Sequence, residues 1–126
     1  MQEQNRADMY ESDVRLAVQE YKEGLGQFEE KMPEIARKYM DFTGACFKAG
    51  ALDEKVKQLI AIGISLGIQD EYCIIYHTQE ALHKGATSEE ILDVVGVCAA
   101  FSGGAAMSQG VTLVQECLND FSGQQH

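Results

Sequence analysis

The chain has 126 residues, of which 45% are hydrophobic and 24% charged, and this composition is typical of one globular domain rather than a disordered chain. We therefore expect a single domain over residues 1–126. The 20 acidic and 10 basic residues give a formal net charge of −10, which argues against nucleic acid or an anionic membrane surface as partners.

The sequence predicts a cytoplasmic protein. Its longest strongly apolar run, over residues 59–68, is too short to cross a bilayer, and its first residues lack the apolar core of a signal peptide. The cysteines, at positions 46, 73, 98 and 117, are sparse and irregularly spaced. In a chain that is not exported they are expected to be reduced thiols rather than a disulfide framework.

Apolar residues recur every three or four positions along most of the chain, which predicts an all-α fold of about six helices and no strands. The apolar stripe of the first helix comprises Val14, Val18, Tyr21, Leu25, Phe28 and Met32. A second helix is expected to begin at Pro33, where the missing N–H of proline costs nothing. Its stripe comprises Ile35, Tyr39, Phe42 and Cys46.

Polar residues mark the starts of the next three helices. Asp53 is a good N-cap for a third helix, which we expect to end at Gly67. A fourth helix is expected from Asp70 to Gly85. Thr87, with a glutamate three residues later, has the spacing of a capping box for a fifth helix.

The third and fifth helices include LIAIGISLGI and ILDVVGVCAAF, which are apolar on nearly every side. One small bundle should not need so much apolar surface, so we predict a homo-oligomer. Gly103–Gly104 is expected to break the fifth helix. The stripe of the last helix comprises Met107, Val111, Val114, Leu118 and Phe121.

The fourth helix carries the residues that point to chemistry. Asp70, Cys73 and His77 are separated by three and four positions and therefore share one helix face, with Tyr72 and Tyr76 expected on other faces. Cys73 lies in the first turn, where the helix dipole favours the reactive thiolate. His77, one turn later, is placed to exchange a proton with it.

Two other interpretations of these residues stay open. Cysteine is commonly a small core residue, and a histidine four positions away is a frequent coincidence. Asp, Cys and His are also metal ligands, but one short stripe would need further ligands from a second element to bind zinc, so we predict no metal and no cofactor. The other three cysteines are expected in the core, with Cys98 as the best candidate for a second thiol near Cys73.

Residues 57–91 read KQLIAIGISLGIQDEYCIIYHTQEALHKGATSEEI. This segment resembles the core of the carboxymuconolactone decarboxylase family, in the AhpD-like group that includes the alkylhydroperoxidases, and the resemblance extends over roughly residues 33–115. It implies an AhpD-like all-α helical bundle. It also implies a homo-oligomer, a trimer or hexamer, with core helices packed between subunits.

The peroxidase branch of that family combines a glutamate with a Cys-x-x-Cys-x-x-x-His motif, in which the second Cys is oxidised and the first resolves it to a disulfide. The resemblance places the second Cys at Cys73 and the motif His at His77. At the position of the first Cys this sequence has Asp70, so the motif disulfide is impossible. At the position of the glutamate it has Gln58, which cannot carry a proton. Asp70 supplies a new carboxylate, although its charge opposes ionisation of Cys73.

The resulting hypothesis is thiol-dependent reduction of a small-molecule peroxide at Cys73, assisted by His77, with Asp70 and Gln58 lining the site and an external thiol resolving the oxidised cysteine. One alternative is an acid–base enzyme of the decarboxylase kind that uses His77 and Asp70. The scarcity of arginine, which a dicarboxylate substrate would favour, weakens that alternative. The other alternative is a binding protein that has lost the motif.

Overall fold

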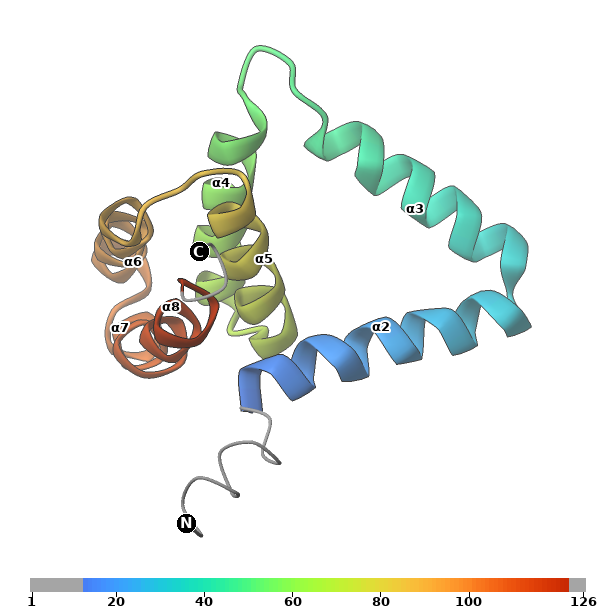
Figure 1. Ribbon diagram of the computed structural model, residues 1–126. Coiled ribbons are helices and arrows are strands. Elements are labelled where there is room, and N and C mark those ends of the chain that lie inside the picture. Colours follow the sequence, from blue (N-terminus) through green and yellow to red (C-terminus); the bar gives the residue numbers. More distant parts are fainter. Residues whose placement is uncertain (1–12, 123–126) are drawn as a thin grey trace, which may run out of the picture.

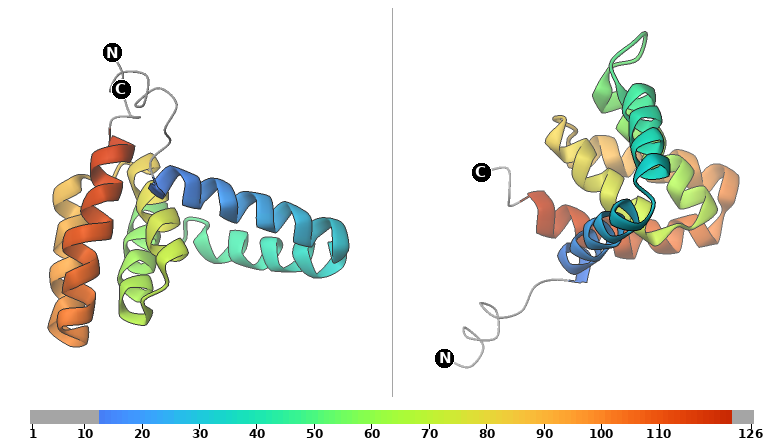
Figure 2. Two further views of the ribbon diagram at one scale, coloured as in Figure 1. Left: turned by 90° about the horizontal axis from the view of Figure 1, so that it is seen from below. Right: turned by 90° about the vertical axis from the view of Figure 1, so that its right-hand side faces the viewer.

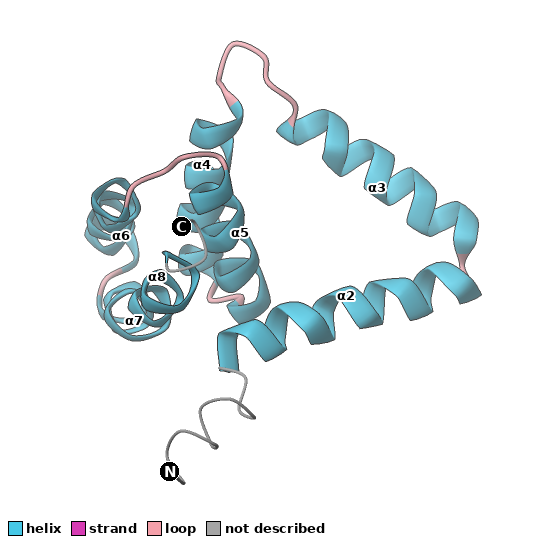
Figure 3. Ribbon diagram, in the orientation of Figure 1, coloured by secondary structure: helices cyan, strands magenta, loops and turns pink. Residues whose placement is uncertain are grey.

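The computed structural model describes residues 13–122, and this part of the chain is helical without any strand (Figure 3). The helices are α2 (Asp13–Lys31), α3 (Pro33–Phe47), α4 (Glu54–Ile68), α5 (Glu71–His83), α6 (Ser88–Ser102), α7 (Gly104–Gln109), the π-helical turn η1 (Gly110–Val114) and α8 (Gln115–Ser122). The last three follow one another without a break. The prediction of an all-α fold with about six helical segments is confirmed.

The helices form a bundle and a projecting hairpin (Figures 1 and 2). In the bundle, α4 packs against both α5 and α6, and the C-terminal run from α7 to α8 packs against α5 and α6. Helices α2 and α3 form the hairpin, which extends away from the bundle. Only the first part of α2 docks on the bundle, through the buried Val14 and Val18.

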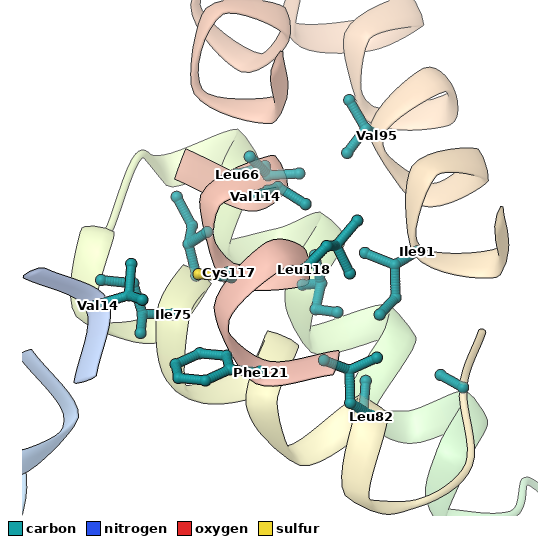
Figure 4. Packing of buried hydrophobic residues seen from close by; sticks show 14 of the residues in the cluster. Val14, Leu66, Ile75, Leu82, Ile91, Val95, Val114, Cys117, Leu118 and Phe121 are labelled. Carbon is teal, nitrogen blue, oxygen red and sulfur yellow. The ribbon is translucent and has the colours of Figure 1, made fainter. Parts of the chain in front are cut away.

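One continuous core holds the bundle together (Figure 4). Burial of such large apolar side chains is the main stabilising contribution in a domain of this size. The largest fully buried apolar side chains are Phe121, Ile62, Leu66, Ile74, Ile91, Val14 and Val114.

The helix starts and ends that depend on local sequence lie where they are predicted. The Asp53 carboxylate accepts a 2.8 Å hydrogen bond from the Val56 N–H at the start of α4, and Thr87 forms the expected capping box with Glu90. Gly85 follows α5 with a left-handed φ of +93°, as a glycine after a helix commonly does.

The end of α4 differs from the prediction. The helix continues through Gly67 to Ile68, and Gln69 adopts the left-handed conformation with φ of +59°. Backbone bonds from the Gln69 N–H to the Leu66 carbonyl and from the Asp70 N–H to the Ser65 carbonyl close the end of the helix. These bonds satisfy carbonyls that would otherwise lack partners, so Gly67 is not needed as the stop.

The predicted apolar stripes of the first two helices are only partly buried. Phe28 of α2 and Met32, between α2 and α3, are exposed. In α3, Ile35, Tyr39 and Phe42 are each more than half exposed, at 53%, 54% and 66%. These residues belong to the hairpin, which projects away from the bundle.

The stripe of the last helix is confirmed in its second half, because Val114, Leu118 and Phe121 are buried, but not in its first half. Met107 and Val111 are exposed, whereas Ala106, Gly110 and Val114 are buried. The π-helical turn adds a residue to one turn and so changes which side chains face the core. None of the helices in residues 13–122 is both long and apolar enough to span a membrane.

Candidate functional site

A cavity of about 600 Å³ lies between the hairpin and the bundle. Cys73 and His77 line it from α5, and Gln58 lines it from α4. Tyr21 from α2 and Phe47 from α3 form part of its other walls. Two of the four predicted site residues therefore come from one face of α5 and a third comes from the neighbouring helix.

His77 is held by a hydrogen bond and by ring contacts. Its Nδ1 lies 2.7 Å from Gln58 Oε1, and its ring stacks on Phe47 with centroids 5.3 Å apart and planes 16° apart. Burial lowers the pKa of His77 below its usual 6.5, although the charges of nearby carboxylates oppose this shift. In the neutral ring, an amide oxygen at Nδ1 places the proton on Nδ1 and leaves Nε2 as an acceptor.

Asp70 is the N-cap of α5, directly beside Cys73. Its Oδ1 accepts a 3.1 Å hydrogen bond from the Cys73 N–H. Asp70 is only partly buried, and it supports Cys73 from the start of the helix rather than lining the cavity. The sequence correctly predicts the cap, but it predicts a lining position that the side chain does not occupy.

Cys73 is a thiol at neutral pH. Burial raises its pKa to about 11, with further upward contributions from a hydrogen bond to Asp70 and from the Asp70 charge, while a hydrogen bond with Ser65 opposes them. The helix dipole was expected to favour the thiolate, but burial and Asp70 outweigh it. Ionisation of Cys73 therefore needs a base during the reaction.

The other three cysteines lie elsewhere. Cys98 lines a second, mostly apolar cavity between α4 and α6, where its thiol donates to the Gly63 carbonyl at 3.4 Å. It is therefore not at the Cys73 cavity, contrary to its selection as the best candidate for a nearby second thiol. Cys117 is buried in the core as expected, and burial raises its pKa to about 12. Cys46 is exposed on α3 rather than in the core.

Tyrosines lie beside Cys73 in the cavity. Tyr72 and Tyr76 line the same cavity as Cys73, whereas the predicted helix pattern places them on other faces. Tyr76 is three positions after Cys73, a spacing that does share a face, and this signal was available in the sequence. Tyr21 and Phe47 come from distant helices, and their approach depends on tertiary packing.

Charged side chains gather at the far end of α5. Lys84 Nζ forms a 2.8 Å ion pair with the Glu54 carboxylate, and both residues line the cavity. Glu80 lines it as well and lies 3.1 Å from the exposed His83. Among residues 13–122, no group of three or more His, Cys, Asp or Glu side chains is arranged to hold a metal ion.

Comparison with known proteins identifies relatives of this chain. The sequence model of the Carboxymuconolactone decarboxylase family matches residues 33–116. An uncharacterized protein of the cox locus in Paracoccus denitrificans is 34% identical over 82 residues, which cover 65% of this chain and 74% of that protein. An uncharacterized protein of Methanocaldococcus jannaschii is 32% identical over 95 residues, which cover 75% of this chain and 91% of that protein.

Solved structures show the same fold. The apo form of a carboxymuconolactone decarboxylase family protein from Legionella pneumophila matches with a TM-score of 0.83 and 30% identity, over 88% of this chain and 99% of that one. A carboxymuconolactone decarboxylase family protein from Thermotoga maritima matches with a TM-score of 0.76, over 86% of this chain and 92% of that protein. Involvement in an antioxidative response has been suggested for the Thermotoga protein. Its identity is 19%, so this second likeness concerns the fold alone.

Proposed function

Because the chain belongs to the carboxymuconolactone decarboxylase family, we propose that it is a thiol-dependent oxidoreductase that reduces a peroxide at Cys73. The observation that carries the proposal is the position of Cys73, in a cavity, hydrogen-bonded to Asp70 and one helical turn before His77. Cys73 and His77 also match the oxidised cysteine and the histidine of the family's peroxidase motif.

The reaction begins as the Cys73 thiol transfers its proton to the Asp70 carboxylate and its sulfur attacks the terminal peroxide oxygen. The O–O bond breaks, and the leaving oxygen takes up a proton to become an alcohol. Cys73 is oxidised to a sulfenic acid by two electrons while the peroxide is reduced by two. His77, fixed by Gln58, offers Nε2 as an acceptor for the peroxide O–H.

An external thiol completes the cycle. It condenses with the Cys73 sulfenic acid and releases water, which leaves a mixed disulfide, and a second thiol reduces that disulfide to regenerate Cys73. The external thiol is required because Asp70 stands where the family's resolving cysteine would be. Neither Cys98 nor Cys46 lines the Cys73 cavity to replace it.

The test is peroxide-dependent labelling of the sulfenic acid. We expect tert-butyl hydroperoxide followed by dimedone to label Cys73, as read by peptide mass spectrometry. Cys73→Ser should abolish that label, and Cys46→Ser, which changes the exposed cysteine of α3, should retain it. Labelling confined to other cysteines, or an unlabelled wild-type protein, would contradict the proposal.

A second candidate, an acid–base enzyme, is favoured by one specific observation. Cys73 is protonated and His77 is neutral with a fixed tautomer, which suits a general base that needs no thiolate. In that case Cys73→Ser should still decarboxylate a carboxymuconolactone, and His77→Gln should not. Loss of this turnover in Cys73→Ser, or its absence from the wild type, would remove the candidate.

A further inference from the structure

We propose that Tyr21 is the general acid that protonates the leaving oxygen of the peroxide, an inference that rests on the proposed function. Residue 21 lies in the hairpin and outside residues 33–116, the segment matched by the family. The assignment therefore adds to the site a catalytic residue that the family motif does not include.

The packing of α2 on α5 holds the Tyr21 ring beside the turn that carries Cys73. The Tyr21 ring centroid lies 6.4 Å from that of Tyr72 and 5.6 Å from that of Tyr76. These two tyrosines are one position before and three positions after Cys73. All four residues line the same cavity, so Cys73 and Tyr21 border one space between α2 and α5.

The Tyr21 hydroxyl is available as a donor. Among residues 13–122 it makes no hydrogen bond, whereas the neighbouring Tyr72 hydroxyl donates to Glu20 at 2.7 Å. Burial raises the Tyr21 pKa above its usual 10, and the charges of surrounding groups, Cys73 and Asp70 among them, raise it further. Tyr21 is therefore protonated at neutral pH and lies close enough to Cys73 and Asp70 to be influenced by their charge.

The proton movements balance without another reactant. As the Cys73 sulfur bonds to the terminal peroxide oxygen, the Tyr21 O–H gives its proton to the other oxygen, which leaves as an alcohol. The Asp70 carboxyl, which holds the proton of the thiol, then releases it to solvent, and the Tyr21 phenolate takes up a proton from solvent. The net change is that a thiol and a hydroperoxide become a sulfenic acid and an alcohol.

The experiment compares two oxidants that differ in their need for an acid. The leaving alkoxide of tert-butyl hydroperoxide must be protonated, whereas the acetate that leaves peracetic acid is stable as an anion. We expect Tyr21→Phe, which keeps the ring and its packing, to slow Cys73 oxidation by tert-butyl hydroperoxide about a hundredfold or more, a usual contribution of general acid catalysis. Oxidation by peracetic acid should stay close to the wild-type rate.

The rate of oxidation by peracetic acid also reports whether the variant is folded. A second variant, Tyr21→Leu, also lacks the hydroxyl and should show the same selective loss of the rate with tert-butyl hydroperoxide. If Tyr21→Phe slows both oxidants equally, or slows neither, the assignment of Tyr21 is overturned while the proposed function stands. If neither oxidant forms a sulfenic acid at Cys73 in the wild type, the proposed function itself fails.

Discussion

At the scale of single residues, Asp70 acts on Cys73 in two opposing ways. Its side chain caps α5 and so positions Cys73 in the first helical turn. The same carboxylate, together with burial, raises the Cys73 pKa to about 11. Below that pKa the thiolate fraction falls about tenfold for each pH unit, so the free thiol is a weak nucleophile near neutral pH.

Asp70→Asn separates these two effects. Asparagine is as good an N-cap as aspartate but carries no charge, so we expect the Cys73 pKa to fall toward its usual value. Iodoacetamide should then alkylate Cys73 faster at pH 8, about tenfold for each unit that the pKa falls. The rate can be followed by mass spectrometry across a pH series.

The matched control is Asp53→Asn, the same change at the N-cap of α4, whose carboxylate has no part in the Cys73 shift. It should leave the alkylation profile of Cys73 unchanged. An unchanged profile in Asp70→Asn would mean that burial alone holds the pKa of Cys73 high.

Gln58→Glu is predicted to reverse the pKa shift of His77. The wild-type pKa of His77 is lowered, so the stability that the neutral ring contributes is present above about pH 6.5, the unfolded value, and is lost as pH falls through the folded pKa. A carboxylate at 58 would lie at the 2.7 Å contact with Nδ1 and favour the imidazolium. NMR titration should show the His77 signal titrating at higher pH, with the exposed His83 as an internal reference.

The sequence predicts Cys73 and His77 of α5 and, through the family resemblance, Gln58 of α4, but not the walls that the hairpin forms. Cys73 and His77 share a face by spacing alone, and that relation holds in any helix. Tyr21 lies on the predicted stripe of the first helix and Phe47 lies on none, and spacing cannot show which neighbour either residue will face. Their approach to Cys73 and His77 depends on how the hairpin folds back, which is a tertiary property.

At the scale of helices, the same division between local and tertiary causes appears. The capping box at Thr87 and the glycine end at Gly85 are predicted because each depends on a few adjacent residues. The burial of the last helix is predicted at Val114, Leu118 and Phe121, but not before the end of the π-helical turn, where Met107 and Val111 are exposed. At that turn, Gly110 lies directly against Val95 of α6.

Gly110→Ala should therefore destabilise the bundle. A Cβ at this position would overlap a Val95 methyl group, so backbone or side chain must move. We expect a loss of about 1–3 kcal/mol in the free energy of unfolding, the usual cost of overpacking, measured by urea denaturation. Adding Val95→Ala should restore part of that loss.

Gly24→Ala, in α2, is the control because nothing lies within 4 Å of its added Cβ. Alanine favours the helix there, so stability should rise by about 0.5–1 kcal/mol. An equal loss in both variants would show that the loss in Gly110→Ala does not come from contact with Val95.

At the scale of the whole molecule, a large apolar surface stays uncovered. Ile60 and Ile64 of α4 are 46% and 59% exposed, and Val97 and Phe101 of α6 are 65% and 91% exposed. The four line one apolar cavity between these helices. Such a contiguous exposed patch is unusual for a monomer, and the two helices are those whose sequences are apolar on nearly every side.

We expect a second copy of the chain to cover this patch, within a trimer or hexamer. Phe101→Glu tests the expectation because the Phe101 side chain is almost fully exposed in one chain, where the change should cost little stability. At an interface the same change would bury an unpaired charge, which is strongly unfavourable. Light scattering at micromolar concentration should therefore give an oligomer for the wild type and a smaller species for the variant.

Ser88→Glu adds the same charge at the exposed start of α6 and should leave the mass unchanged. A monomeric wild type, or a Phe101→Glu variant of unchanged mass, would mean that this patch is not the interface.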